Sequence, residues 1–115
     1  MFQKDMRLSL LLVFYGEVLS RRRRELITLY YNEDFSLSEI AEHTGISRQG
    51  VRDSIKKSEQ ELLHLEETLG LASRFESLQK QLKEICGDLH TLSEKHADMC
   101  APLQEIIQKL ENLSI

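Results

Sequence analysis

Apolar residues recur at helical spacing near the start of the chain, and this pattern predicts two helices there. The first is expected from about residue 5 to residue 19, and the second begins after Ser20, a favourable N-cap residue. A short polar loop follows, and Phe35 is placed to pack against the chain where it enters the next helix. The apolar faces of these two helices consist of Leu8, Leu11, Leu12, Tyr15, Leu19, Leu26, Ile27, Leu29 and Tyr30.

The segment 36–57 has the pattern of a helix-turn-helix, with signals for both helices and for the turn between them. Ser36 and Glu39 have the spacing of a capping box at the start of the first helix. Gly45 supplies the left-handed backbone of the turn, and Ser47 caps the second helix. The positions expected to be buried are Ile40, Ala41, Ile46, Val51, Ile55 and Leu62.

The second helix of this motif exposes a face that carries mostly basic and amide side chains. Arginine can form paired hydrogen bonds with guanine and glutamine with adenine, while lysine contacts phosphates. The alternative is an ordinary solvated helix face, because Glu39, Glu42 and Asp53 lie nearby. The helix is expected to run to about Leu69, where Gly70 ends it. The candidate nucleic-acid-binding residues are Ser47, Arg48, Gln49, Arg52, Lys56 and Lys57.

Two features of the chain are unfavourable for the helices in which they fall. Gly50 costs its helix up to about 1 kcal/mol relative to alanine, which indicates either a close backbone approach or sequence drift. The run Arg21, Arg22, Arg23 and Arg24 places four cations at a helix start, where the macrodipole opposes positive charge. These arginines are therefore candidates for contacts with phosphates or with an acidic partner. The alternative is that some pair with Glu17 or Glu25 and the rest are solvated.

The last part of the chain, residues 71–115, carries a heptad pattern that predicts a long amphipathic helix. Ser73 and Glu76 have the spacing of a second capping box at its start. Pro102 is expected to kink or break this helix, with the tail continuing for a turn or two. The seam positions alternate three and four residues apart: Phe75, Leu78, Leu82, Ile85, Leu89, Leu92, His96, Met99, Leu103, Ile106, Leu110 and Leu113.

The chain is therefore expected to be all-α, with a helix-turn-helix domain over residues 1–70 and a C-terminal helical extension over residues 71–115. The seam is a larger apolar surface than a monomer normally exposes, so the extension is expected to fold back on the first domain, to pair with another copy, or both. Regular heptads favour a homodimer. Because His96 is the one polar residue in the seam, acidification towards about pH 6 is expected to weaken that dimer.

Composition and charge restrict the possible functions. The net charge is −4 and the sequence pI about 5.6, whereas DNA-binding proteins are usually basic, so binding must rest on local basic clusters. Two cysteines without a disulfide framework favour a reducing compartment and hence the cytoplasm. The apolar run Leu8 to Tyr15 is too short to span a bilayer and is expected to be a buried helix. No metal-binding spacing or catalytic motif is present, so neither a metal, a cofactor nor enzymatic activity is expected.

The wider sequence resembles two related groups of bacterial helix-turn-helix proteins. Residues 19–62 are similar to the promoter-binding C-terminal domain of sigma factors. Residues 5–70 resemble the YlxM-type proteins more closely still. The segments that carry this second resemblance are VFYGEVLS (13–20), LYYNEDFSLSEIAE (29–42) and SRQGVRDSIKKSEQ (47–60). It implies a link to the signal recognition particle pathway.

Two functions are consistent with these features. In the first, the chain is a DNA-binding regulatory protein that acts through the helix after Ser47 and takes part in the signal recognition particle pathway, with RNA as a further candidate ligand. In the second, it is a protein- or RNA-interaction accessory of the signal recognition particle without sequence-specific DNA binding. The intact basic face favours the first function, and the acidic net charge favours the second.

Overall fold

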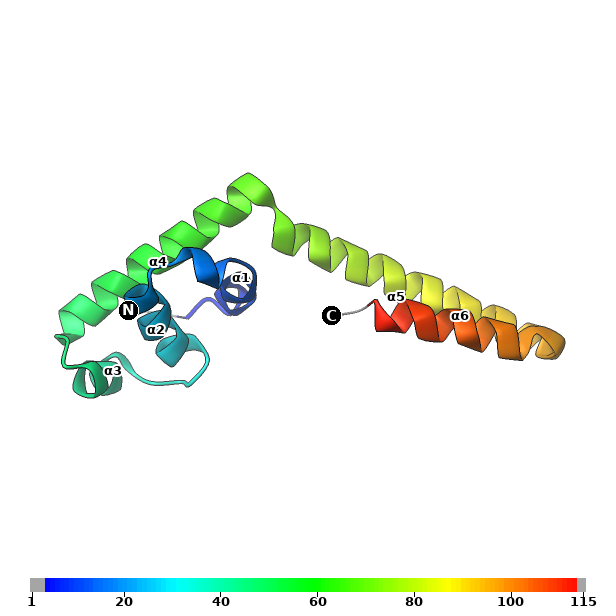
Figure 1. Ribbon diagram of the computed structural model, residues 1–115, viewed down its shortest axis with the longest axis horizontal. Helices are drawn as coiled ribbons and strands as arrows, with labels where there is room; N and C mark the ends of the chain where they lie inside the picture. Colours follow the sequence, from blue (N-terminus) through cyan, green and yellow to red (C-terminus); the bar gives the residue numbers. More distant parts are fainter. Residues whose placement is uncertain (1–3, 114–115) are drawn as a thin grey trace. The chain divides into compact units, whose positions relative to one another are not determined.

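The computed structural model describes residues 4–113, and within this range the regular structure is entirely helical, which confirms the predicted all-α fold. The chain divides into two compact units, residues 1–72 and 73–115. Figure 1 shows the helices in chain order. They are α1 (Arg7–Tyr15), the 3-10 turn η1 (Gly16–Val18), α2 (Arg21–Tyr31), α3 (Leu37–Thr44), α4 (Arg48–Leu69), α5 (Leu71–Lys95), the 3-10 turn η2 (Ala97–Met99) and α6 (Cys100–Asn112).

In the first unit, α4 is the helix against which α1, α2 and α3 all pack. Its residues Val51, Ile55 and Leu62 are completely buried, at the helical spacing that the sequence predicts. Ile27 of α2 and Ile40 of α3 are completely buried as well. The other buried apolar side chains of this core are Leu8, Leu11, Leu12, Tyr15, Leu19, Leu26, Tyr30, Tyr31 and Ala72. Burying a large aliphatic side chain contributes about 1.5–3 kcal/mol, so this core stabilises the unit more than helix propensity does.

The apolar run near the N-terminus forms α1, which contributes Leu8, Leu11 and Leu12 to the core. The prediction of a buried first helix is therefore confirmed. Among the described residues, no helix combines the length and the apolar character needed to cross a membrane.

The predicted helix-start signals of the first unit are present. The Ser20 hydroxyl accepts a hydrogen bond from the amide of Arg23 at 3.4 Å and caps α2. Ser36 and Glu39 form the predicted capping box at the start of α3, with both hydrogen bonds at 3.1 Å. Each cap satisfies an amide that would otherwise lack a partner at the helix end. The local sequence thus determines where α2 and α3 begin.

Two of the predicted helix boundaries differ from the structure. The first helix ends at Tyr15 and not at Leu19, because the next three residues tighten into η1. Gly70 ends α4 as predicted, with a φ of 65° that favours glycine. α5 then begins at once at Leu71, so the prediction that Ser73 starts this helix is wrong.

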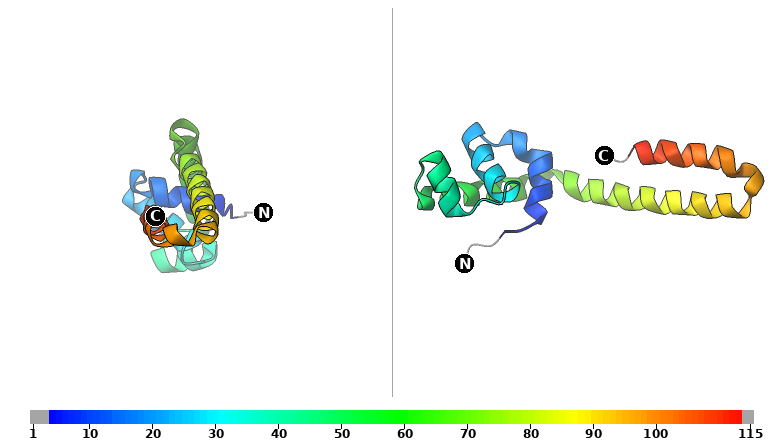
Figure 2. Two further views of the ribbon diagram at one scale, coloured as in Figure 1. Left: turned by 90° about the vertical axis from the view of Figure 1, so that its right-hand side faces the viewer. Right: turned by 90° about the horizontal axis from the view of Figure 1, so that it is seen from below.

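The second unit is a helical hairpin, and the prediction of one long helix is wrong. After Lys95 the chain turns through η2, and α6 runs back beside α5 in both views of Figure 2. His96 leaves the helical conformation, with φ −129° and ψ 82°, and is exposed. The helix does break in this region, but at residues 96–99 and not at Pro102, and α6 continues for 13 residues where a turn or two was predicted. Pro102 lies in the first turn of α6. Backbone amides in a first turn have no acceptor within the helix, so the missing amide hydrogen of proline costs no hydrogen bond there.

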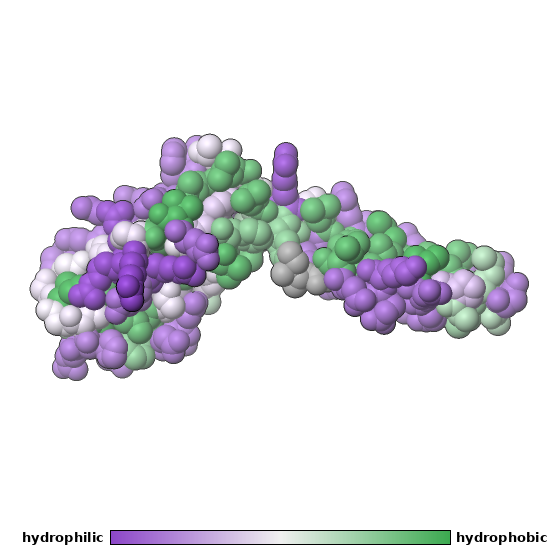
Figure 3. Space-filling model, in the orientation of Figure 1, coloured by the Kyte–Doolittle hydropathy of each residue, from purple (hydrophilic) through white to green (hydrophobic). Residues whose placement is uncertain are grey.

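The hairpin divides the heptad pattern between a buried face and an exposed one, so the predicted continuous seam is also wrong. Leu103 and Ile107 of α6 and Ser93 of α5 are buried. Figure 3 shows that hydrophobic residues gather along this hairpin. Five exposed apolar residues of this unit are here called the exposed stripe. They are Leu78, Ile85 and Leu92, spaced seven apart along α5, and Ile106 of α6 with Leu113 directly after it.

Candidate nucleic-acid interface

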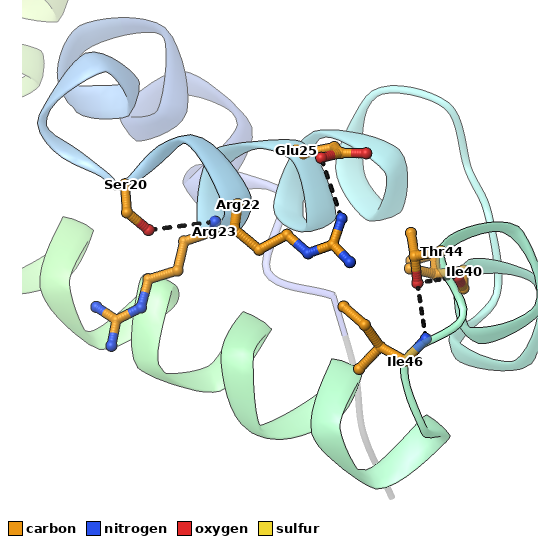
Figure 4. A network of polar contacts seen from close by, with 7 residues as sticks. All are labelled: Ser20, Arg22, Arg23, Glu25, Ile40, Thr44 and Ile46. Atoms are coloured by element: carbon orange, nitrogen blue, oxygen red, sulfur yellow. Dashed lines mark hydrogen bonds and ion pairs between the residues drawn. The ribbon is translucent and has the colours of Figure 1, made fainter.

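The turn between α3 and α4 fixes the junction of the helix-turn-helix. The hydroxyl of Thr44 donates to the carbonyl of Ile40 at 2.7 Å and accepts from the amide of Ile46 at 3.4 Å (Figure 4). Gly45 has a φ of 75°, the left-handed conformation predicted for it. Ile46 is partly buried and packs against the core, as the sequence predicts. The orientation of α4 relative to α3 is thus set by a side-chain bridge, a glycine turn and an apolar contact.

The start of α4 is held by Ser47 and Gly50. The Ser47 hydroxyl accepts a hydrogen bond from the Gly50 amide at 3.0 Å, so this oxygen serves as the N-cap. A Cβ atom on Gly50 would lie 3.0 Å from Cγ2 of Ile46 and 3.1 Å from the Ser47 hydroxyl oxygen. Of the two explanations that the sequence allows for this glycine, the structure favours close approach, since Ile46 folds over it.

The five longer candidate side chains on α4 are all exposed. They are Arg48, Gln49, Arg52, Lys56 and Lys57. Asp53 is also exposed on this helix and accepts a hydrogen bond from Nε2 of Gln49 at 3.0 Å. This part of α4 thus exposes four basic side chains and the carboxylate of Asp53, and Gln49 must leave Asp53 before it can contact a base.

The four-arginine run divides into paired and unpaired members. Arg22 forms an ion pair with Glu25 at 3.4 Å (Figure 4), as one of the sequence alternatives predicts. Arg23 reaches from α2 to Glu61 on α4 at 3.1 Å. Within residues 4–113, Arg21 and Arg24 form no ion pair and line a shallow groove on α2. Arg22 and Arg23 therefore form ion pairs within the first unit, while Arg21 and Arg24 leave positive charge available at the surface.

Arg23 of the arginine run lies apart from the candidate face of α4. The α4 partner of Arg23 is Glu61, which follows Arg52 by nine residues. At 1.5 Å per residue this is roughly 14 Å farther along the helix. Arg23 therefore does not belong to the candidate nucleic-acid interface.

Carboxylates on the inner flank of α4 are the partners that the sequence analysis missed. Glu66 is buried and accepts hydrogen bonds from the Tyr15 hydroxyl and the Ala72 amide. Glu59 accepts one from the Tyr31 hydroxyl, which itself accepts from the amide of Asp5. A signal exists in the sequence, because Glu59 and Glu66 each follow a core position of α4 by four residues.

Burial raises the pKa of all three tyrosines in the chain. For Tyr15 the loss of hydration is the main cause of the raised pKa, and the hydrogen bond to Glu66 adds to it. Burial likewise raises the pKa of Tyr30, although Lys4 opposes it, and the pKa of Tyr31, where Glu59 adds. Burial also raises the pKa of the Glu59 carboxyl, against the effect of the Tyr31 hydrogen bond. In each of these groups, burial favours the protonated form.

No metal site is found in the part of the chain that the structure describes, since no three histidine, cysteine or carboxylate residues come together there.

Comparison with known proteins places this helix-turn-helix in a family. Residues 2–110 match the UPF0122 family model, which is described as "putative helix-turn-helix protein, YlxM / p13 like". A UPF0122 protein of Clostridium kluyveri is 40% identical over 111 residues, covering 96% of this chain and 94% of the relative. One of Acetivibrio thermocellus is 39% identical over 107 residues, covering 91% and 92%, and one of Listeria welshimeri is 36% identical over 109 residues, covering 92% and 99%. The chain belongs to the UPF0122 family of helix-turn-helix proteins.

Proposed function

We propose that this protein binds nucleic acid through the N-terminal half of α4 and acts as a regulatory DNA-binding protein. The observation that supports this proposal is the set of exposed basic and amide side chains on the second helix of a capped helix-turn-helix. In proteins with this motif, the second helix enters the major groove and its N-terminal residues contact base edges. Arg48, Gln49 and Arg52 occupy those positions here, and Lys56 and Lys57 follow them towards the phosphates.

The charges predict weak and strongly salt-dependent binding. The net charge of −4 repels DNA at long range, and Asp53 lies within the contact face. Local contacts of Arg52, Lys56 and Lys57 with phosphates and bases must supply the affinity. Specificity would come from the arginine and glutamine side chains, because their hydrogen bonds distinguish bases.

A mobility-shift experiment at low salt tests this proposal. Replacing Arg48, Arg52 and Lys56 together by alanine should weaken binding to duplex DNA at least about tenfold. The matched control replaces Arg74, Lys80 and Lys83, three exposed cations of α5, by alanine and changes the net charge equally. Equal loss in both variants, or no binding of the unaltered protein to duplex DNA or structured RNA, would refute the proposal.

A second candidate function is that of an interaction accessory of the signal recognition particle. The observation that favours it is charge: the net charge of −4 suits a protein partner better than a polyanionic nucleic acid. The link to this particle rests on the resemblance to YlxM-type proteins. Capture of particle components from lysate, with and without nuclease, distinguishes an RNA-mediated association from a protein-mediated one. If the alanine variant of Arg48, Arg52 and Lys56 still captures the particle components, this result would support the second candidate function over the first.

We also propose that the protein is a homodimer that pairs through the exposed stripe of the second unit. The stripe presents Leu78, Ile85 and Leu92 at heptad spacing, and they are 58%, 46% and 41% exposed. Such a regular apolar surface is typical of a helix that packs against another helix. A symmetric dimer would present two copies of α4, which suits a two-fold DNA site.

A further inference from the structure

A shallow groove runs along the exposed side of α2 and the loop that follows it. Its volume is about 580 Å³. The groove follows α2 from Arg21 to Leu29, roughly 12 Å of helix, and continues onto Glu33 and Phe35 of the loop before α3. The residues that line it are Arg21, Arg24, Glu25, Thr28, Leu29, Glu33 and Phe35.

One end of this groove carries uncompensated positive charge. Arg21 and Arg24 lie three residues apart and so share a helix face. Both are exposed and form no ion pair with any residue of the described range 4–113, whereas Arg22 and Arg23 are neutralised by Glu25 and Glu61. The positive end of the α2 macrodipole adds to their charge. Two free guanidinium groups at this end favour a ligand that brings carboxylates or another anion.

The rest of the groove is unsuited to a simple anion. Leu29 and Phe35 are partly buried and form its apolar floor, and the Phe35 ring is held edge-to-face against His43 with centroids 5.8 Å apart. The exposed carboxylate of Glu33 lies at the far end. A nucleic-acid backbone carries negative charge along its whole length and would be repelled there. The groove therefore fits a ligand that is anionic at one end, apolar in its middle and cationic at the other end.

We propose that this groove binds a short amphipathic segment of a partner protein, at least about 8 residues long if helical. Acidic side chains of the segment pair with Arg21 and Arg24, apolar side chains lie on Leu29 and Phe35, and a basic residue faces Glu33. Packing of the apolar face of an amphipathic helix into a groove is a recurring mode of peptide recognition. The site is separate from the candidate face of α4, so the protein would hold a protein partner independently of nucleic acid.

The test is a selection of displayed random peptides of that length on the full-length protein, followed by affinity measurement with the enriched peptides. We expect enriched peptides to carry acidic residues at one end and large apolar residues in the middle. Replacing Arg21 and Arg24 by glutamine should weaken their binding at least about tenfold, since two charge-assisted interactions are lost. The matched control replaces Lys80 and Lys83 of α5 by glutamine and should leave the affinity unchanged.

Two further measurements make the outcome decisive. Repeating the selection on the Glu33→Lys variant should change the preferred residue at the far end of the peptide from basic to acidic. Circular dichroism should show an unaltered fold for the Arg21→Gln and Arg24→Gln double variant, since it only removes unfavourable charge from a helix start. Enrichment of peptides that the double variant binds equally well would overturn the proposal. So would a loss of duplex DNA affinity in the double variant as large as the loss of peptide affinity, because the arginines would then be phosphate contacts.

Discussion

The hydroxyl of Tyr15 donates a 2.7 Å hydrogen bond to the buried carboxylate of Glu66, which lies 51 residues later in the chain. The same two side chains serve the start of α5: the Tyr15 oxygen accepts from the Leu71 amide and Glu66 accepts from the Ala72 amide, both at 3.0 Å. Helix-start amides lack helical acceptors, and this pair supplies them. Residues distant in sequence therefore perform the capping role that local sequence assigned to Ser73.

Removing the Glu66 carboxylate should destabilise the first unit. The Glu66→Ala variant leaves the Tyr15 hydroxyl and the Ala72 amide without their acceptor, which costs about 1–3 kcal/mol for buried polar groups. The midpoint of urea unfolding, followed by circular dichroism, measures this cost. Glu67→Ala, at the exposed neighbouring position, is the control and should change stability little. Equal midpoints for the two variants would show that the Glu66 contacts add nothing to stability.

High pH should unfold the protein because all three phenols have a raised pKa. In the unfolded chain they ionise near their ordinary value of about 10, while the folded state still holds their protons. Stability is therefore full below about pH 10 and is lost as the pH rises through the folded pKa values. Tyrosinate absorbance and circular dichroism should change together in one transition. Tyrosine ionisation well before any loss of helix would contradict this prediction.

Glu59 should make the protein less stable at neutral pH than a neutral side chain would. Burial raises its pKa, so the folded state favours the protonated form. Stability is then greatest below the unfolded value of about 4.3 and falls as the pH rises through the folded pKa. The stability advantage of Glu59→Gln over the natural protein should grow across that window, as measured by denaturant midpoints at a series of pH values. The control Glu67→Gln changes an exposed carboxyl and should show no such trend.

The parts of the fold that sequence predicted well are those fixed by neighbouring residues. The Ser36 cap, the Gly45 turn and the burial of Val51 and Ile55 depend on residues within one or two helical turns. Such local signals predict the helix-turn-helix and indicate which face of α4 is exposed. Pairings such as Arg23 with Glu61 join different helices, and no local pattern contains them.

The C-terminal hairpin shows why the heptad pattern misled the sequence analysis. The spacing of Leu92, His96, Met99 and Leu103 continues without interruption through the turn, although the backbone reverses there. A periodic pattern records which positions are apolar and does not record whether the chain stays straight between them. Pro102 was the only local sign of a break, and it marks the first turn of the second helix.

Single substitutions on α4 should separate base contacts from phosphate contacts. If the proposed interface is correct, Arg52→Ala costs about 1–3 kcal/mol at one base position and relaxes specificity there. Lys56→Ala should weaken binding to all sequences alike and lower the salt slope by about one. Salt titrations on a set of duplexes provide both measurements, with Lys80→Ala as a control that should change neither. A Lys56→Ala effect confined to one sequence would show that this lysine contacts a base.

The last prediction concerns self-association through the exposed stripe. Within the hairpin, α6 covers only one flank of α5, and Leu78, Ile85 and Leu92 remain in contact with water. If a second copy covers them, a charge at the middle of the stripe should prevent pairing, because an unpaired charge is costly to bury. Light scattering at tens of micromolar should therefore give twice the 13.4 kDa chain mass for the natural protein and the single mass for Ile85→Glu. Lys80→Gln lowers the net charge equally at an exposed position on the opposite side of α5 and should stay dimeric. His96 lies in the exposed turn, outside the stripe. The expectation of a dimer that weakens near pH 6 therefore no longer follows. His96→Leu should leave the mass unchanged between neutral pH and about pH 6. A natural protein that is strictly monomeric under these conditions would refute the dimer and leave the stripe to another partner.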